Sequence, residues 1–146
     1  MTKMKWLAGA ALFTLAGLLI GADTPGVNYV SHDKVAAALA KGGPLVQTGE
    51  FTVSGSHRDK GGQVEVHDKE TDILYIIEGA ATFVTGGTMV GGKTTRPGQQ
   101  VGTDIQGGQT HRLVKGDVIT VPAGVPHWFK EVPQSVSYFV VKVLKP

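Results

Sequence analysis

A succession of short β-rich runs, each ended by glycine or proline, constrains this chain more than any other feature of its sequence. The runs span residues 45–53, 63–67, 73–77, 81–85, 110–114, 118–121, 127–132 and 135–144. Many short strands separated by turn residues are typical of antiparallel sandwiches and barrels. The sequence therefore predicts one all-β domain over residues 45–146, an antiparallel barrel of the jelly-roll type. Gly79 is expected to end one strand, and Ser54 with Gly55 another; the glycine-rich stretch 86–108 should be a loop or ragged hairpin.

A single helix is expected in the lead-in that spans residues 23–44. Ser31 is a suitable N-cap for a helix over residues 31–41, and Gly42, Gly43 and Pro44 would end it. Its apolar stripe would consist of Val35, Ala36, Leu39 and Ala40. We expect this short N-terminal helix to cover an edge of the barrel, and we assign no chemistry to it.

The first 22 residues have the order of a secretory signal. Lys3 and Lys5 give a positive start, residues 6–20 are almost entirely apolar, and Gly21 and Ala22 are small residues suited to a cleavage site. The apolar run is about 15 residues, shorter than the roughly 20 that a membrane-spanning helix needs. We therefore expect a cleaved signal peptide, export to the periplasm or the medium, and no stable membrane span in the mature form.

The net charge and the absence of cysteine limit which macromolecular partners the chain can have and which atoms can bind a metal. The chain has 14 Lys and Arg against 12 Asp and Glu, and removal of Lys3 and Lys5 with the signal leaves 12 of each. A neutral mature chain lacks the basic surface of a nucleic-acid binder, so we expect no nucleic-acid partner. Because there is no cysteine, neither disulfides nor thiolate ligands are available, and any metal must be bound through nitrogen and oxygen.

Two segments carry side chains that could hold a metal ion, residues 64–79 and 116–129. Glu65 and His67 lie two residues apart and so share one face of a strand. If the turn after His67 is a hairpin, Asp72 returns beside them, and His127 comes from a distant strand. Two imidazoles and two carboxylates would suit Fe, Mn, Zn or Ni. The alternative is a solvated, charge-rich turn with histidines that only form hydrogen bonds.

These two segments resemble the paired motifs of the cupin superfamily. The second cupin motif is Gly, five residues, Pro-x-Gly, two residues and His, and it is matched in full from Gly116 through residues 122–124 to His127. The first cupin motif is a glycine-led His-x-His, followed by Glu and then Gly. Aligned on Gly79, this chain has His67 at the second His, but Glu65 and Asp72 stand where the family has His and Glu.

The resemblance implies a cupin barrel with a metal held inside it by Glu65, His67, Asp72 and His127. The departures leave two outcomes open. A shell of two histidines and two carboxylates would favour harder ions such as Mn or Fe. Alternatively, the metal is lost, and two neighbouring acids raise the pKa of one carboxyl group. The Asn that often follows the second-motif His by four residues is Glu131 here.

Three further residues are candidates for substrate binding, and no catalytic residue is assigned. His57 and Arg58 stand in a polar stretch typical of an exposed turn; otherwise they would form a pair at the mouth of the pocket that holds an anionic ligand. His111 would reach the pocket if its strand face points inward. Of Trp128 and Phe129, one should lie in the core.

Two functional classes follow from the sequence. The chain is either a metal-dependent enzyme acting on a small molecule or a non-catalytic module that binds a small ligand. In the second class the metal is structural or absent. A homodimer is one expected way of covering exposed strand edges.

Overall fold

The computed structural model describes residues 26–146. The expected signal segment and its cleavage site lie outside these residues. The elements are α1 (His32–Lys41), β1 (Gly43–Gln47), β2 (Phe51–Arg58), β3 (Val64–His67), β4 (Glu70–Thr85), β5 (Thr88–Val90), β6 (Lys93–Arg96), β7 (Gln99–Gly102), β8 (Asp104–Gln106), β9 (Gln109–Val114), β10 (Val118–Val121), β11 (His127–Glu131) and β12 (Val136–Leu144). Between residues 26 and 146, no helix is long and apolar enough to cross a membrane.

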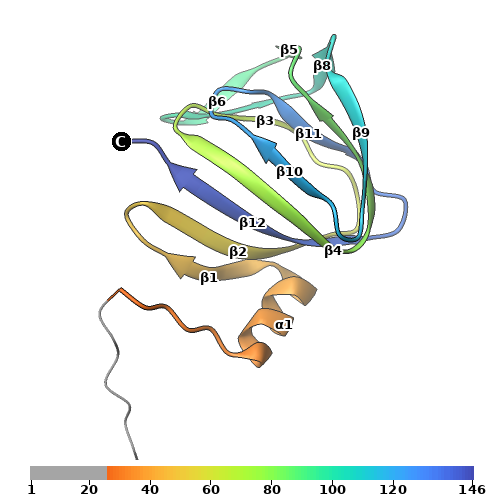
Figure 1. Ribbon diagram of the computed structural model, residues 1–146. Helices are drawn as coiled ribbons and strands as arrows, with labels where there is room; N and C mark the ends of the chain where they lie inside the picture. Colours follow the sequence, from red (N-terminus) through yellow and green to blue (C-terminus); the bar gives the residue numbers. More distant parts are fainter. Residues whose placement is uncertain (1–25) are drawn as a thin grey trace, which may run out of the picture.

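Two antiparallel sheets share the long strand β4 (Figure 1). The first half of β4 pairs with β12 and β10, and β12 continues the sheet through β2 to β1. The second half pairs with β9 and β11, and β11 continues through β3 and β7 to β6. The expected fold class is confirmed: the domain is an all-β antiparallel jelly roll with one short helix, although the sheet does not close on itself among the described strands.

Gly79 marks the place where β4 passes from one sheet to the other. Its φ is +79°, and a Cβ at this position would lie 2.0 Å from the carbonyl oxygen of Ser135. The expectation that Gly79 ends a strand is therefore wrong. Glycine adopts a left-handed φ without steric cost, so the strand bends at this residue and the ladder continues.

The first predicted strand, 45–53, is also divided differently. The hydroxyl of Thr48 accepts hydrogen bonds from the backbone N–H groups of Glu50 and Phe51, at 3.2 and 3.0 Å, which makes a turn between β1 and β2. Strand β2 then runs past Gly55 to Arg58, because its pairing with β12 continues to Arg58 after its pairing with β1 has ended at Gly55. His57 and Arg58 therefore lie in a strand, and the expectation of an exposed turn is wrong.

The helix α1 packs on β2 at Gly55, where a Cβ would come within 2.7 Å of the backbone of Ala38. Ser31 is the N-cap residue as expected, but its side chain makes no capping hydrogen bond. Ala38 is the buried residue of α1, whereas Ala36 and Ala40 are exposed, which corrects part of the predicted stripe. The stretch 86–108 forms two nested pairs, β5 with β8 and β6 with β7, and β7 adds to β3.

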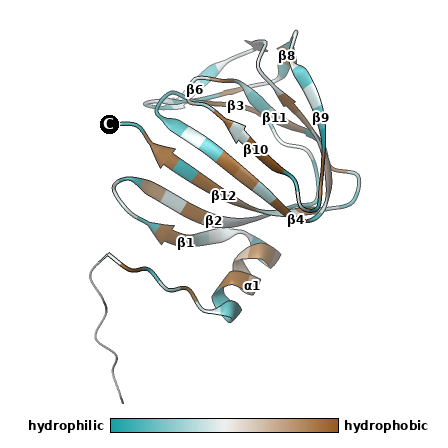
Figure 2. Ribbon diagram, viewed as in Figure 1, coloured by the Kyte–Doolittle hydropathy of each residue, from teal (hydrophilic) through white to brown (hydrophobic). Residues whose placement is uncertain are grey.

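The apolar core lies between the two sheets, and Figure 2 shows bands of hydrophobic residues along β4 and β12. Its members are Leu74, Ile76, Ala81, Phe83, Leu113, Val121, Phe129, Val136 and Tyr138. Phe129 is in the core and Trp128 is not, as the alternation predicted. The buried polar side chains of the described residues are His67, Asp72 and His127. Polar burial is thus confined to the residues that the sequence singled out.

Candidate metal centre

Backbone hydrogen bonds bring the two sequence motifs together. The N–H of Gly124 donates to the carbonyl oxygen of His67 at 2.8 Å, and the N–H of Ala123 donates to Thr71 Oγ1 at 3.3 Å. Gly124 has a φ of +81°, which the turn before His127 requires and which favours glycine. The turn that precedes His127 is therefore bound to the turn that follows His67, and this sets the distance between the two imidazoles.

The four residues predicted as metal ligands converge on one point. The Nε2 atom of His67 is 3.5 Å from Glu65 Oε2 and 3.5 Å from Asp72 Oδ2, and His127 Nε2 is 3.7 Å from Asp72 Oδ2. The hairpin expected to place Asp72 is not formed, because β3 pairs with β7 and β11 and not with β4. Asp72 instead reaches His67 from the facing sheet, after the chain crosses over at residues 68–69.

Both histidines present the same ring nitrogen to this point. The Nδ1 atom of His127 lies 3.1 Å from the carbonyl oxygen of Val125, and that of His67 forms a hydrogen bond with the side-chain oxygen of Gln99. A carbonyl oxygen can only accept, so each Nδ1 carries the hydrogen and a neutral ring leaves its Nε2 lone pair free. This is the arrangement that metal-binding histidines adopt.

The residues fit a divalent ion. The Nε2 atom of His67 is buried and has no hydrogen-bond partner among the described residues, which is costly for a polar atom unless something else satisfies it. Ligand atoms about 2.1 Å from a tetrahedral ion are about 3.4 Å apart, close to the distances of 3.5 and 3.7 Å seen here. Two overlapping sets have all their ligand atoms within 4.8 Å: Glu65, His67 and His127, and His67, Glu70 and Asp72.

Lys142 is a cation already placed beside these carboxylates. Its Nζ donates to both oxygens of Asp72, at 2.8 and 2.9 Å, and is 3.0 Å from Glu70 Oε2. Lys142 is the β12 partner of Asp72 in the ladder with β4. Asp72 is therefore bound to a fixed positive charge, whereas Glu65 carries the longer contact of 3.8 Å to Arg58 Nη2.

Burial and charge pairing shift the pKa values of all four residues. Burial lowers the pKa of His67, but the carboxylates of Asp72 and Glu65 outweigh it and raise the value to about 9. Burial also lowers the pKa of His127, and here the neighbouring acids do not reverse the shift. The pKa of Glu65 is lowered, chiefly by its contact with His67. Burial would raise the pKa of Asp72, but His67 and Lys142 together lower it.

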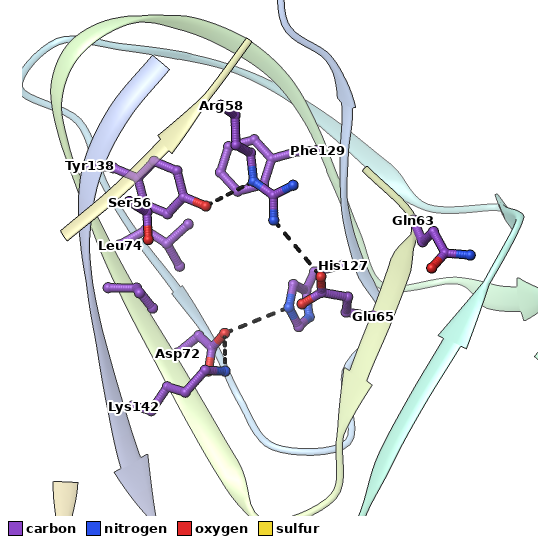
Figure 3. A pocket seen from close by; sticks show the side chains of 11 residues that line it. Ser56, Arg58, Gln63, Glu65, Asp72, Leu74, His127, Phe129, Tyr138 and Lys142 are labelled. Atoms are coloured by element: carbon purple, nitrogen blue, oxygen red, sulfur yellow. Dashed lines mark hydrogen bonds and ion pairs between the residues drawn. The ribbon is translucent and has the colours of Figure 1, made fainter. Parts of the chain in front are cut away.

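A cavity of about 190 Å³ opens beside this group of residues (Figure 3). Figure 3 shows Arg58 and Tyr138 across the cavity from Asp72 and Lys142, with Glu65 and His127 between them. The lining is completed by Ser56, Gln63, Leu74, Phe129 and Val140. Three of the four candidate ligands, Glu65, Asp72 and His127, thus line a space that a small molecule could enter.

Of the three substrate-binding candidates, the structure brings only Arg58 to this cavity. His57 is bonded to Ser137 Oγ at 2.8 Å and to Asp59 at 3.0 Å, and it lines a separate groove. His111 is 2.9 Å from the hydroxyl of Thr85, the residue paired with His127, and so lies one strand away from the site. Glu131 binds the hydroxyl of Thr82 at 3.2 Å and is exposed.

Four residues of the site were not singled out from the sequence: Glu70, Gln99, Tyr138 and Lys142. Gln99 lies in the glycine-rich stretch. Lys142 and Tyr138 lie in a strand whose β-branched and aromatic residues indicate a strand but no site. The alternation along β12 does place Tyr138, Val140 and Lys142 on one face. To predict that this face of β12 lies at the site, one must also know the register in which β12 pairs with β4.

Comparison with known proteins places the chain in a family. A protein-family model described as Cupin matches residues 23–146. No curated protein that was compared matches the chain. KdgF from Halomonas sp. has a similar structure, with 14% sequence identity and a TM-score of 0.51, over 71% of this chain and 79% of that one. This similarity is one of fold.

Two further solved structures match at TM-scores of 0.48. One is a cupin-family protein with a double-stranded β-helix fold from Methanocaldococcus jannaschii, 19% identical, over 70% of this chain and 78% of that one. The other is the DMSP lyase DddQ from Ruegeria pomeroyi, also 19% identical, over 70% of this chain and 42% of that one.

Proposed function

The chain belongs to the cupin family, and we propose that it binds one divalent metal ion in its barrel and acts on a small molecule in the adjoining cavity. The ligands would be Glu65, His67 and His127, with Asp72 as a fourth once it is released from Lys142. The mixture of imidazole nitrogen and carboxylate oxygen suits Fe, Mn, Zn or Ni.

The buried Nε2 of His67 carries this proposal. Among the described residues it has no hydrogen-bond partner, and it faces two carboxylates at 3.5 Å, a separation that suits a shared ion. His127 adds a second Nε2, oriented by the carbonyl oxygen of Val125.

The ion, when bound, would supply Lewis-acid polarisation of a ligand oxygen. Side chains of this protein would line the cavity and orient the bound molecule. Leu74, Phe129 and Val140 give the cavity an apolar wall that excludes water. Arg58 and Tyr138 provide polar groups beside this apolar wall, across the cavity from Asp72 and Lys142, where they would orient the bound molecule.

Export is part of the same proposal, supported by the signal-like order of the first 22 residues. The mature chain would then carry no net charge and would work in the periplasm or outside the cell. A homodimer through an exposed sheet edge, such as β1 or β6, remains part of the proposal.

The rival function is a metal-free module that binds a small ligand. One observation favours it: Lys142 already gives Asp72 and Glu70 a cation at 2.8 to 3.0 Å. In that case the acids of the site would need no ion, and the pocket would hold its ligand through Arg58, Glu65 and their neighbours.

Elemental analysis separates the two functions. Mature protein purified without chelator should contain about one Fe, Mn, Zn or Ni per chain, and both His67→Ala and His127→Ala should lose it while keeping the β-sheet circular dichroism spectrum. His32→Ala is the matched control, because the His32 side chain is 91% exposed on α1. Protein without metal, even after each ion has been supplied, would reject the metal proposal in favour of the rival.

A further inference from the structure

Arg58 is held in place at the cavity without a hydrogen bond from its two terminal nitrogens to any described residue. Its Nε donates to the hydroxyl of Tyr138 at 2.9 Å, and the guanidinium carbon lies 4.8 Å from the ring centre of Phe129. Gly62 leaves room for the head group, since a Cβ there would come within 2.7 Å of Nη1. The hydrogen bond to Tyr138 and the contact with the Phe129 ring thus fix the side chain of Arg58, and the absence of a side chain at Gly62 leaves space for it.

The two terminal nitrogens of Arg58 make no hydrogen bond to any of the described residues. Nη2 has only the ion pair with Glu65 at 3.8 Å, and Figure 3 shows the fork directed toward Glu65 and His127. A guanidinium presents paired, parallel donors that match the two oxygens of a carboxylate. An oriented fork with free donors in a cavity wall is therefore a ready site for a planar anion.

The charge of the metal-loaded pocket also favours an anion. Two carboxylates, Glu65 and Asp72, line the cavity against two cations, Arg58 and Lys142. Histidines that bind a metal are neutral, so a divalent ion adds two uncompensated positive charges. Even with Glu70 counted, one positive charge is left over. A bound ion would also draw Glu65 toward itself and leave Arg58 without an acidic partner.

We propose that the cavity binds a small molecule bearing a carboxylate, with that carboxylate on the terminal nitrogens of Arg58 and its carbon skeleton against Leu74, Phe129 and Val140. This inference rests on the proposed metal function for the excess of charge, and on the placement of Arg58 for the carboxylate itself. Tyr138 acts as a positioning residue that holds the fork through Nε.

Calorimetric titration with matched acids and amides tests the inference. The protein is loaded with the ion it retains, or with Mn²⁺ if it retains none, and titrated with acetate, butyrate and benzoate, each beside its own amide. At least one acid should bind ten times more tightly than its amide. Arg58→Gln should abolish that preference, and Arg58→Lys should restore part of it, because lysine keeps the charge but not the fork.

Two controls separate a failure of this inference from a failure of the metal proposal. Arg112→Gln, an exposed arginine of β9, should leave the preference for acids unchanged. The metal content of Arg58→Gln should equal that of the parent. If metal is present but no acid is preferred, or Arg58→Gln keeps the preference, the carboxylate site is overturned and the metal site stands. If no ion binds, an Arg58-dependent preference in the metal-free protein supports the carboxylate site alone, and no preference overturns both.

Discussion

Glu65 and His127 stand directly opposite each other on the antiparallel strands β3 and β11. This is the one ladder pair between β3 and β11, and it places one carboxylate beside one imidazole on the same face of the sheet. Asp72, by contrast, comes from the facing sheet and is bound to Lys142. The geometry therefore favours Glu65 over Asp72 as a carboxylate ligand of the proposed ion.

Glu65→Gln should weaken metal binding at least about tenfold, since loss of a ligand charge ought to exceed the effect of losing an outer partner. Glu131→Gln is the matched control, because Glu131 lies at the other end of β11 and only contacts Thr82. Competition with a fluorescent chelator measures both. Equal affinities for the two variants would remove Glu65 from the site.

Gln99 should matter to the metal although it does not touch it. Its side-chain oxygen accepts the Nδ1 hydrogen of His67, and outer partners of this kind are typically worth about 10- to 100-fold in affinity. Gln99→Met is therefore expected to lower metal affinity within that range, while Gln100→Met, one residue further along β7, leaves it unchanged. A Gln99→Met protein with the parent's affinity would mean that His67 is oriented by packing alone.

Lys142→Met should have opposite effects on the metal-free and metal-loaded proteins. Without metal, Asp72 and Glu70 lose their cation, and we expect a loss of about 1 to 3 kcal/mol in unfolding free energy, between the values for exposed and buried pairs. Metal affinity should rise, because Asp72 becomes free to bind the ion. Thermal melts with and without Mn²⁺ check this, with the exposed Lys145→Met as control. If Lys142→Met does not bind metal more tightly, Asp72 is not a ligand.

The metal-free protein should lose stability as the pH rises from about 6.5 to about 9. The pKa of His67 is about 9 in the folded chain against an ordinary value of 6.5, so the folded state holds a proton that the unfolded state releases. That contribution is full below 6.5 and is lost as the pH passes 9. Urea unfolding in EDTA should show the decline, and His67→Gln should lack it while His111→Gln retains it. A metal ion reverses the trend, because it needs the neutral imidazole and binds more tightly as the pH rises.

Gly79→Ala should destabilise the domain by about 2 to 4 kcal/mol, because a left-handed φ is combined with a collision against the carbonyl of Ser135. Gly107→Ala is the matched control: its φ is +70°, but nothing lies within 4 Å of the added Cβ. Gly107→Ala should lower the unfolding free energy by about 1 kcal/mol, because only the left-handed backbone conformation is unfavourable for alanine there. Urea unfolding measures both variants. Equal losses of unfolding free energy would contradict the role of the close contact at Gly79.

The local pattern of the sequence predicts the fold class, and the resemblance of its two motifs to those of cupins implies the four polar residues that the structure brings together. The hairpin expected to place Asp72 beside His67 is nevertheless not formed. The second motif places His127, and the alternation in β3 puts Glu65 and His67 on one face. Local signals fail at Gly79, because a glycine that bends a strand and one that ends it look alike in sequence. Only the pairing of both halves of β4 distinguishes the two cases.

The partners of the site could not be predicted for a different reason. Gln99 is 32 residues from His67, and Lys142 is 70 residues from Asp72. Each is brought in by strand register, β7 against β3 and β12 against β4, and a shift of one residue would turn either side chain to the other face. Register depends on the assembled sheets and not on any short stretch of sequence.

The position of β12 has a consequence for how the chain acquires its structure. This strand, the last in the chain, lies between β2 and β4 at the middle of its sheet. During synthesis the earlier strands therefore lack their central neighbour until residues 136–144 have left the ribosome, and the barrel cannot assemble stepwise from its N-terminal end. The sheet that holds Asp72 and Lys142 is therefore completed only after almost the whole of the described chain has been synthesised.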